Sequence, residues 1–268
     1  MTELAVDEVA SRLARDCLCE LPRAVSGLRW VLKLAMPKRT LHRGPGTAIA
    51  LTFDDGPSDE TVQILDCLEE HDAVGTFFVL GQHIAGREHV LRRMVELGCE
   101  IGNHTFAHPR LSALSDEDAR TELQRCSDAI RAVVRHSPRL MRPPYGDHSP
   151  ATPEVAERLG LGTVLWTIPT RDWDGSTGEM IADRILEAVR PGGVVVLHDG
   201  SAEGADRGPT VDAVRIVVPA ILERGHRLVT VSQLLRLDRR ARLEIVVLRR
   251  GSFRWMLAAA GRRLRGVS

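Results

Sequence analysis

Short apolar runs alternate with longer amphipathic stretches through the middle of the chain. The apolar runs are rich in Val, Ile, Leu and Phe and stop at Gly, Pro, Asn or Asp, a pattern typical of buried strands. They predict seven strands, at residues 47–53, 75–80, 99–102, 139–142, 162–166, 193–197 and 227–231. The stretches between and after them predict seven helices, at residues 58–71, 82–97, 115–136, 152–159, 176–189, 210–224 and 232–237.

Seven strand-then-helix units predict an α/β fold with a parallel sheet, closed or nearly closed, and helices on its outside. Parallel sheets of this kind carry their functional sites at the carboxyl ends of the strands. Several polar residues follow predicted strand ends: Asp54, Asp55, His104, Arg142 and His198. We therefore expect these side chains to meet at one rim, although they are far apart in sequence.

The two ends of the chain differ from this core. Residues 1–45 have apolar positions near helical spacing and then a basic stretch with Gly and Pro, which predicts a helical N-terminal extension to a catalytic domain at 46–237. Residues 238–268 form a basic C-terminal extension with nine arginines and an apolar stripe. Two interpretations stay open for this extension: a strand and helix packed on the barrel, or an amphipathic segment on an anionic membrane or a protein partner.

Composition narrows the class of protein. The 268 residues carry no formal net charge, which does not favour a nucleic-acid partner. The five cysteines form no paired framework, so reduced thiols are expected. The start of the chain lacks a basic segment followed by an apolar one, and no apolar run reaches the ~20 residues that span a bilayer. We therefore expect a cytoplasmic protein.

Two carboxylates and two imidazoles point to a metal site. Asp54 and Asp55 end the first strand and precede a Gly-Pro turn. Neighbouring carboxylates repel one another unless their roles differ, for example when one binds a metal and the other a proton. His104 and His108 are four residues apart, so on a helical turn both face one ion. Asp54 or Asp55 would be the third ligand, and such a set suits zinc, but also cobalt, nickel or iron(II).

Two further residues suggest proton transfer. Arg142 precedes a Pro-Pro pair and would hold a carboxylate ionised through paired hydrogen bonds, or would form a structural salt bridge. His198 ends a Val-rich strand and is a general-acid candidate beside a metal site, although a lone histidine is more often structural.

Together these stretches resemble the polysaccharide deacetylase family, the NodB-type carbohydrate esterases of family 4, over roughly residues 47–231. The motifs that carry the resemblance occur in the family's order: Thr-Phe-Asp-Asp-Gly-Pro at 52–57, His-Thr-x-x-His at 104–108, Arg-x-Pro-Tyr at 142–145, Asp172-Trp173, and Leu197-His198-Asp199. The resemblance implies a distorted (β/α) barrel with fewer than eight strands.

The resemblance also implies a role for each matched residue. It makes Asp54 the catalytic base, oriented by Arg142, and His198 the catalytic acid, tuned by Asp172. The implied metal ligands are Asp55, His104 and His108. On the substrate side, Tyr145 would offer its backbone N–H to the oxyanion, and Trp173 and Leu197 would wall the acyl pocket.

The expected activity is metal-dependent hydrolysis of an N-acyl amide, with zinc as the expected metal. The chain has one Tyr, four Trp and five Phe, few for a groove that stacks a polymer, so we expect a small N-acetylated amino sugar as substrate. The alternatives are deacetylation of a polymeric glycan, cleavage of an ester or formamide, and a non-catalytic domain that binds metal or glycan.

Overall fold

Strand β1 (Ala48–Asp54) runs through the middle of the sheet. The computed structural model describes residues 47–237 and 247–248. β1 pairs in parallel with β7 (Val194–His198) from Ala50 to Asp54. On its other side it pairs with β8 at its beginning and with β2 at its end. All seven residues of β1 are buried, as the unbroken apolar run predicted.

The remaining strands extend the sheet on both sides of β1, in the order β6-β7-β1-β2-β3-β4-β5-β9. Their bounds are Thr76–Val79 (β2), Glu100–Asn103 (β3), Leu140–Met141 (β4), Gly162–Val164 (β5), Ile168–Pro169 (β6), Arg227–Leu228 (β8) and Val247–Leu248 (β9). Strands β1 to β8 are parallel to their neighbours, and β9 pairs antiparallel with β5. Within the described residues, β5 does not pair with β6, so the curled sheet is not closed into a complete barrel.

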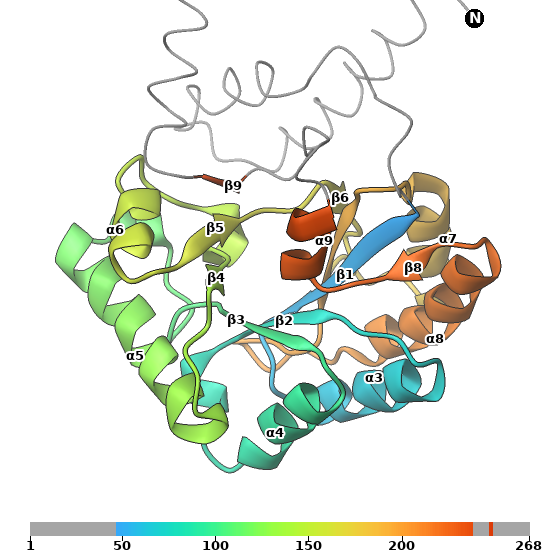
Figure 1. Ribbon diagram of the computed structural model, residues 1–268, viewed down its shortest axis with the longest axis horizontal. Coiled ribbons are helices and arrows are strands. Elements are labelled where there is room, and N and C mark those ends of the chain that lie inside the picture. The colour runs from blue at the N-terminus through green and yellow to red at the C-terminus, as the bar shows by residue number, and fades with distance from the viewer. Residues whose placement is uncertain (1–46, 238–246, 249–268) are drawn as a thin grey trace, which may run out of the picture. The chain divides into compact units, whose positions relative to one another are not determined.

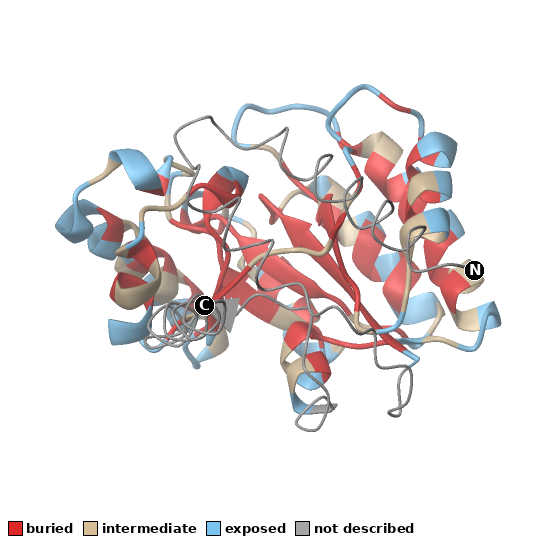
Figure 2. Ribbon diagram, turned by 90° about the horizontal axis from the view of Figure 1, so that it is seen from above, coloured by how far each residue is buried: buried red, intermediate tan, exposed pale blue. Residues whose placement is uncertain are grey.

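Helices surround the curled sheet (Figure 1). Their bounds are Asp59–Glu70 (α3), Glu88–Glu96 (α4), Asp116–Val134 (α5), Thr152–Arg158 (α6), Gly178–Ala188 (α7), Gly208–Glu223 (α8) and Val231–Leu237 (α9). Short 3-10 turns stand at Gly81–His83 (η2), Leu111–Ala113 (η3) and Pro144–Gly146 (η4). The buried strands lie inside, and the helices turn their exposed residues outward (Figure 2).

Alternation along β1 separates two apolar clusters. Ile49, Leu51 and Phe53 belong to the large cluster that the helices α3, α7 and α8 cover. Ala48 and Ala50 belong to a second cluster, which also holds residues of β2, β4, β5, β7 and α9 and fills the inside of the curl. Since Asp54 continues the series of Ala48 and Ala50, the strand directs this carboxylate inward.

The structure confirms the predicted fold class and each predicted strand, with ends shifted by a few residues. Strand β6 was not predicted, and β9 lies in the C-terminal extension, for which a strand was one of two open interpretations. The predicted helix at 82–97 is instead a 3-10 turn followed by α4, with Gly86 at a φ of 82° between them. The predicted N-terminal extension, residues 1–45, and all but 247–248 of the C-terminal extension lie outside the described residues. Within the described part of the chain, no helix is both long and apolar enough to cross a bilayer.

Candidate metal and proton-transfer site

Asp54 and Asp55 follow one another at the carboxyl end of β1, yet their surroundings differ. Asp54 lies beside His198 in the pairing of β1 with β7. Asp55 has left the strand and has a φ of 77°, a left-handed conformation that only glycine adopts without strain. This change of backbone direction sends the two carboxylates toward different partners.

The loop after β3 brings His104 and His108 together. Both were predicted to lie on a helical turn, but this loop is not helical, and His108 itself has a φ of 63°. Helix α5 holds the loop, because Glu122 accepts the backbone N–H groups of Phe106 and Ala107 at 3.0 and 2.8 Å. The two imidazole rings end with their centroids 5.2 Å apart.

Three ligand atoms of Asp55, His104 and His108 lie within 4.8 Å of one another, as a metal ion requires. Asp55 Oδ1 is 3.4 Å from His104 Nε2 and 3.1 Å from His108 Nε2. His104 donates its Nδ1 proton to the Arg142 carbonyl at 2.7 Å, so a neutral His104 turns the lone pair of Nε2 toward Asp55. Asp55 Oδ1 is buried and has no hydrogen-bond donor. A divalent cation fits this set, because it would accept the lone pairs that the carboxylate oxygen and the imidazole nitrogens direct toward one another.

The electrostatics of Asp55 agree with a ligand that is ionised. Burial alone would raise the pKa of this carboxyl, but the facing imidazoles of His104 and His108 outweigh burial and hold the pKa well below its usual range. Asp55 therefore offers a carboxylate, the form that binds metals, across the whole physiological pH range.

Arg142 contacts the other carboxylate. Its Nη1 donates to Asp54 Oδ1 at 2.8 Å and lies 2.7 Å from Thr52 Oγ1, inside the curl. The Arg142 side chain is fully buried and packs over the Phe78 ring at 4.3 Å. The ion pair with Asp54 balances the charge of this buried guanidinium and fixes Asp54 Oδ1. The other carboxylate oxygen, Asp54 Oδ2, lies 4.0 Å from His104 Nε2.

His198 and Asp172 form the second charged pair. His198 Nδ1 is 2.8 Å from Asp172 Oδ1, and the backbone N–H of His198 donates to Asp172 Oδ2 at 2.7 Å. Thr210 also donates to Asp172 Oδ2, at 2.9 Å. Burial alone would lower the pKa of His198, but the charge and hydrogen bond of Asp172 outweigh it and raise the pKa to about 9. The His198 imidazole is thus a cation at neutral pH, with Nε2 left for another partner.

Two exposed aromatic rings stand beside these histidines. Tyr145, 48% exposed, has its ring centroid 4.6 Å from that of His108, and Arg110 packs over the Tyr145 ring at 4.3 Å. Trp173, 43% exposed, meets the His198 ring edge-on at 5.3 Å. Among the described residues, no acceptor is found for the backbone N–H of Tyr145, which leaves this donor available to a ligand.

The structure does not bring Leu197 to this site. Leu197 is fully buried in the cluster under the helices and lies beside Phe53 in the strand pairing. Successive residues of a strand face opposite sides, so Leu197 faces away from His198 and Val196 is on the side of His198. The sequence interpretation of Leu197 as a pocket wall overlooked this alternation.

Four residues that the sequence interpretation left without a role also support the site: His83, Glu122, Asp199 and Thr210. Asp199 directly follows His198, and burial raises its pKa to about 7 against a hydrogen bond from Thr61. The motif around His198 indicated Asp199, but the patterns around His83 and Glu122 gave no such signal.

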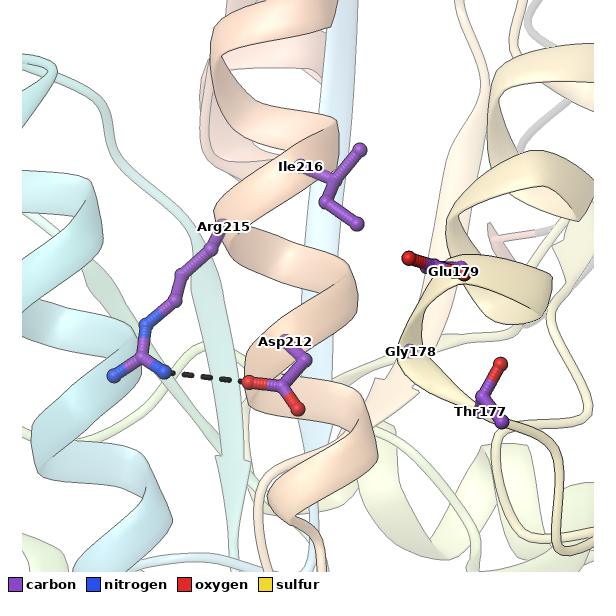
Figure 3. A pocket seen from close by; sticks show the side chains of 6 residues that line it. All are labelled: Thr177, Gly178, Glu179, Asp212, Arg215 and Ile216. Carbon is purple, nitrogen blue, oxygen red and sulfur yellow. Dashed lines mark hydrogen bonds and ion pairs between the residues drawn. The ribbon is translucent and has the colours of Figure 1, made fainter.

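A separate hollow of about 430 Å³ lies between α7 and α8 (Figure 3). It is lined by residues of both helices and by the N-cap residue of α7: Thr177, Gly178, Glu179, Asp212, Arg215 and Ile216. An ion pair of 3.3 Å joins Arg215 to Asp212 on its wall. None of the histidines or carboxylates described above lines this hollow, so it is distinct from the candidate site.

Comparisons with known proteins agree with the geometry. The sequence model of a protein family described as polysaccharide deacetylase matches residues 42–164. A chitooligosaccharide deacetylase of Bradyrhizobium sp. (strain ANU 289) is 36% identical over 197 residues, which cover 70% of this chain and 90% of that protein. The site residues Asp54, Asp55, His104, His108 and Arg142 all fall within the matched range.

Solved structures share the fold. A variant of the peptidoglycan deacetylase PdaC from Bacillus subtilis matches with a TM-score of 0.67 and 30% identity, over 83% of this chain and 98% of that one. An acetyl xylan esterase from Clostridium thermocellum, solved with a cobalt ion, matches with a TM-score of 0.67 and 31% identity, over 71% of this chain and 91% of that one.

Proposed function

Because this chain belongs to the polysaccharide deacetylase family, we propose that it removes the N-acetyl group of an amino sugar by metal-assisted hydrolysis. The observation that carries the proposal is the convergence of Asp55, His104 and His108 beside a second, separately held carboxylate, Asp54. One carboxylate for a metal and one for a proton is the division of roles that amide hydrolysis at a metal centre requires.

Asp55, His104 and His108 would hold the cation, and we infer that the cation is zinc. A set of two imidazoles and one carboxylate is typical of catalytic zinc sites, and it leaves coordination positions open. Cobalt, nickel and iron(II) accept the same ligands. When bound, such an ion polarises an acyl carbonyl and makes water acidic enough to react near neutral pH.

Asp54 is the proposed general base. Arg142 occupies Asp54 Oδ1, so Oδ2 is the oxygen left to accept a proton from the attacking water. The same hydrogen bond fixes the orientation of the Asp54 carboxyl group.

His198 is the proposed general acid. Asp172 holds its Nδ1 and keeps the imidazole charged, so a proton is available at Nε2 for the departing amine. The free backbone N–H of Tyr145 would donate to the oxygen that becomes negative during attack. The exposed rings of Tyr145 and Trp173 would bound the space around the acyl group.

For the substrate, we propose a small N-acetylated amino sugar or a small molecule that contains one. Among the described residues, Tyr145 and Trp173 are the exposed aromatic residues. Two such rings offer few positions on which sugar rings of a long glycan could stack. A longer glycan is the second candidate, because the relatives are named for chito-oligosaccharides and peptidoglycan. A cytoplasmic location and a membrane or protein contact of residues 238–268 stay predictions.

The test is acetate release from monomeric, oligomeric and polymeric N-acetylglucosamine compounds, with added zinc or cobalt. We expect release from the monomer, and release at least about 10²-fold slower in the same reactions with Asp54→Asn. Release from oligomers or polymers alone would select the second candidate. An absence of release from every compound, by a folded and metal-loaded chain, would contradict the proposed deacetylation.

A further inference from the structure

All four backbone polar groups of Asp55 and Gly56 are hydrogen-bonded. Asp55 donates its N–H to the Phe78 carbonyl at 3.2 Å, and the Gly56 carbonyl accepts the N–H of Leu80 at 2.8 Å. The two polar groups of the peptide that joins Asp55 to Gly56 face side chains. His83 Nδ1 donates to the Asp55 carbonyl at 2.8 Å, and the Gly56 N–H donates to Asp199 Oδ1 at 3.1 Å.

Such complete pairing matters here because Asp55 has the left-handed backbone described above. A strained conformation persists only where its surroundings hold it in place. Relaxation of Asp55 would turn its side chain away from His104 and His108, and the three ligand atoms would no longer converge.

Asp199 is itself firmly anchored. It is fully buried, its Oδ2 accepts the Thr61 hydroxyl at 2.6 Å, and its backbone N–H donates to the Asp54 carbonyl at 3.0 Å. The Ser58 hydroxyl donates to its backbone carbonyl. Asp199 therefore connects the end of β7 to the turn after β1 and to the start of α3.

The turn at Asp55 and Gly56 packs tightly against Asp199 and Gly200. A Cβ atom on Gly56 would overlap the Asp199 carboxylate, and one on Gly200 would overlap the backbone carbonyl of Asp55. The second overlap is with backbone, which cannot move aside as a flexible side chain can. Glycine at both positions allows β7 and the turn to approach within hydrogen-bond distance.

We propose that His83 and Asp199 are positioning residues of the metal site, which clamp the Asp55–Gly56 peptide so that Asp55 faces His104 and His108 before a cation arrives. A ligand set that is already in place loses less freedom on binding and therefore binds its ion more tightly. This inference rests on the proposed metal site, but it concerns residues that touch neither the cation nor the substrate.

The first test compares the zinc affinity of the full chain with that of His83→Leu, by competition with a chromophoric chelator. Loss of an outer hydrogen bond to a metal ligand typically costs about 10-fold to 100-fold in affinity, and we expect a loss in this range. His83→Asn, which keeps a donor near the Nδ1 position, should restore most of the affinity. At saturating zinc, His83→Leu should recover most of its kcat.

His71→Leu is the matched control. His71 is also partly buried, and its Nδ1 also faces a backbone carbonyl, that of Cys67, at 2.9 Å. It lies at the end of α3, and its carbonyl partner belongs to no ligand. We expect this variant to lose some thermal stability and to keep the zinc affinity of the unmodified chain.

The second arm uses Asp199→Asn and Asp199→Ala, with thermal unfolding of the metal-free protein as the check on folding. Asn keeps the acceptor for the Gly56 N–H, so it should bind zinc more tightly than Ala does. Equal zinc affinity of folded His83→Leu and His71→Leu would overturn the clamp while the metal site stands. Absence of zinc binding by the unmodified chain would instead overturn the proposed function.

Discussion

The neighbouring carboxylates Asp54 and Asp55 have different electrostatic partners at this site. Asp54 is tied to a fixed cation, Arg142, at 2.8 Å, whereas Asp55 faces two imidazoles that have no fixed charge. The backbone of Asp55 makes this separation possible, because a φ of 77° turns its side chain out of the alternation of β1. Five of the non-glycine residues with left-handed backbone lie at or next to the site: Asp55, Thr105, His108, Tyr145 and Arg171. Such clustering is typical of functional sites.

At this scale, Asp54→Asn should lower kcat by about 10²-fold to 10⁴-fold, the usual contribution of a general base. The amide cannot accept the proton, but it still accepts the hydrogen bond from Arg142, so the fold should be kept. Steady-state kinetics at saturating zinc measure the loss, and Asp66→Asn, an exposed carboxylate paired with Arg93, is the control. A kcat close to that of the unmodified chain would remove Asp54 from the proposed role.

The His198–Asp172 pair predicts the basic limb of the pH profile. A raised pKa means that the charged, proton-donating form persists to higher pH, so kcat should fall as the pH rises through about 9. The raised pKa of His198 also contributes to the free energy of unfolding. This contribution is fully present below about pH 6.5, falls as the pH rises, and is lost once the pH passes about 9.

Asp172→Asn should move that basic limb to lower pH. The carboxylate charge and its hydrogen bond are what raise the pKa of His198, while burial, which remains, lowers it. The measurement is kcat against pH, and the control is Asp174→Asn, a nearby carboxylate that contacts Ser176 and Arg184 instead. An unshifted limb in a folded Asp172→Asn chain would show that Asp172 does not tune His198.

Among the elements, helix α5 is more than an outer layer. Its Glu122 accepts two backbone N–H groups from the loop between the two histidines, so it fixes how His108 approaches Asp55. The helix also accepts a hydrogen bond at the Leu123 carbonyl from Asn103, the last residue of β3. The loop thus depends on a helix that touches no ligand atom.

Glu122→Ala should therefore weaken zinc binding more than it changes the stability of the metal-free chain. The half-buried N–H of Phe106 and the exposed N–H of Ala107 both lose their acceptor, and the loop is no longer tied to the helix. Zinc titration measures the effect, with Glu117→Ala on the same helix as control, because Glu117 is exposed and pairs with Arg120. Matching zinc affinities for both variants would rule out this dependence.

Most elements were predictable because their patterns are local. The Val-rich run before His198 and the Ser115 cap of α5, which accepts the Asp118 N–H, are visible in a few residues. β6 was missed because it has two residues and one is Pro169, which a strand tolerates only at an edge. The orientation of Leu197 was missed because the alternation along β7 was overlooked. The loop of His108 was missed because its contacts with Glu122 of α5, not local spacing, decide its shape.

For the whole molecule, the curled parallel sheet explains why residues 54 and 198 meet. β1 and β7 are neighbours in register, so their carboxyl ends place Asp54 beside His198 although about 140 residues separate them in sequence. The large cluster under the helices and the smaller one inside the curl hold these strand ends in place. The metal ligands then join β1 to the loop after β3.

A cation bound across this rim should stabilise the folded chain as a whole. A ligand that binds only the folded state adds about 2.7 kcal/mol at a concentration of about 100 times its Kd. For a domain of about 200 residues this is on the order of 5–10 °C in Tm. Thermal unfolding with zinc and with a chelator measures the difference, which His104→Ala should abolish. A Tm that ignores zinc in the unmodified chain would contradict a bound ion.

The most direct measurement is the number of zinc ions that the purified chain retains at equilibrium, beside that of Asp55→Ala. Asp55→Ala leaves Asp54, Arg142, His198 and Asp172 unchanged, so it isolates the metal from the proton-transfer groups. We predict one ion per unmodified chain and none, or a much weaker one, in the variant. An unmodified chain without zinc, or a variant that retains it with equal affinity, would contradict the account.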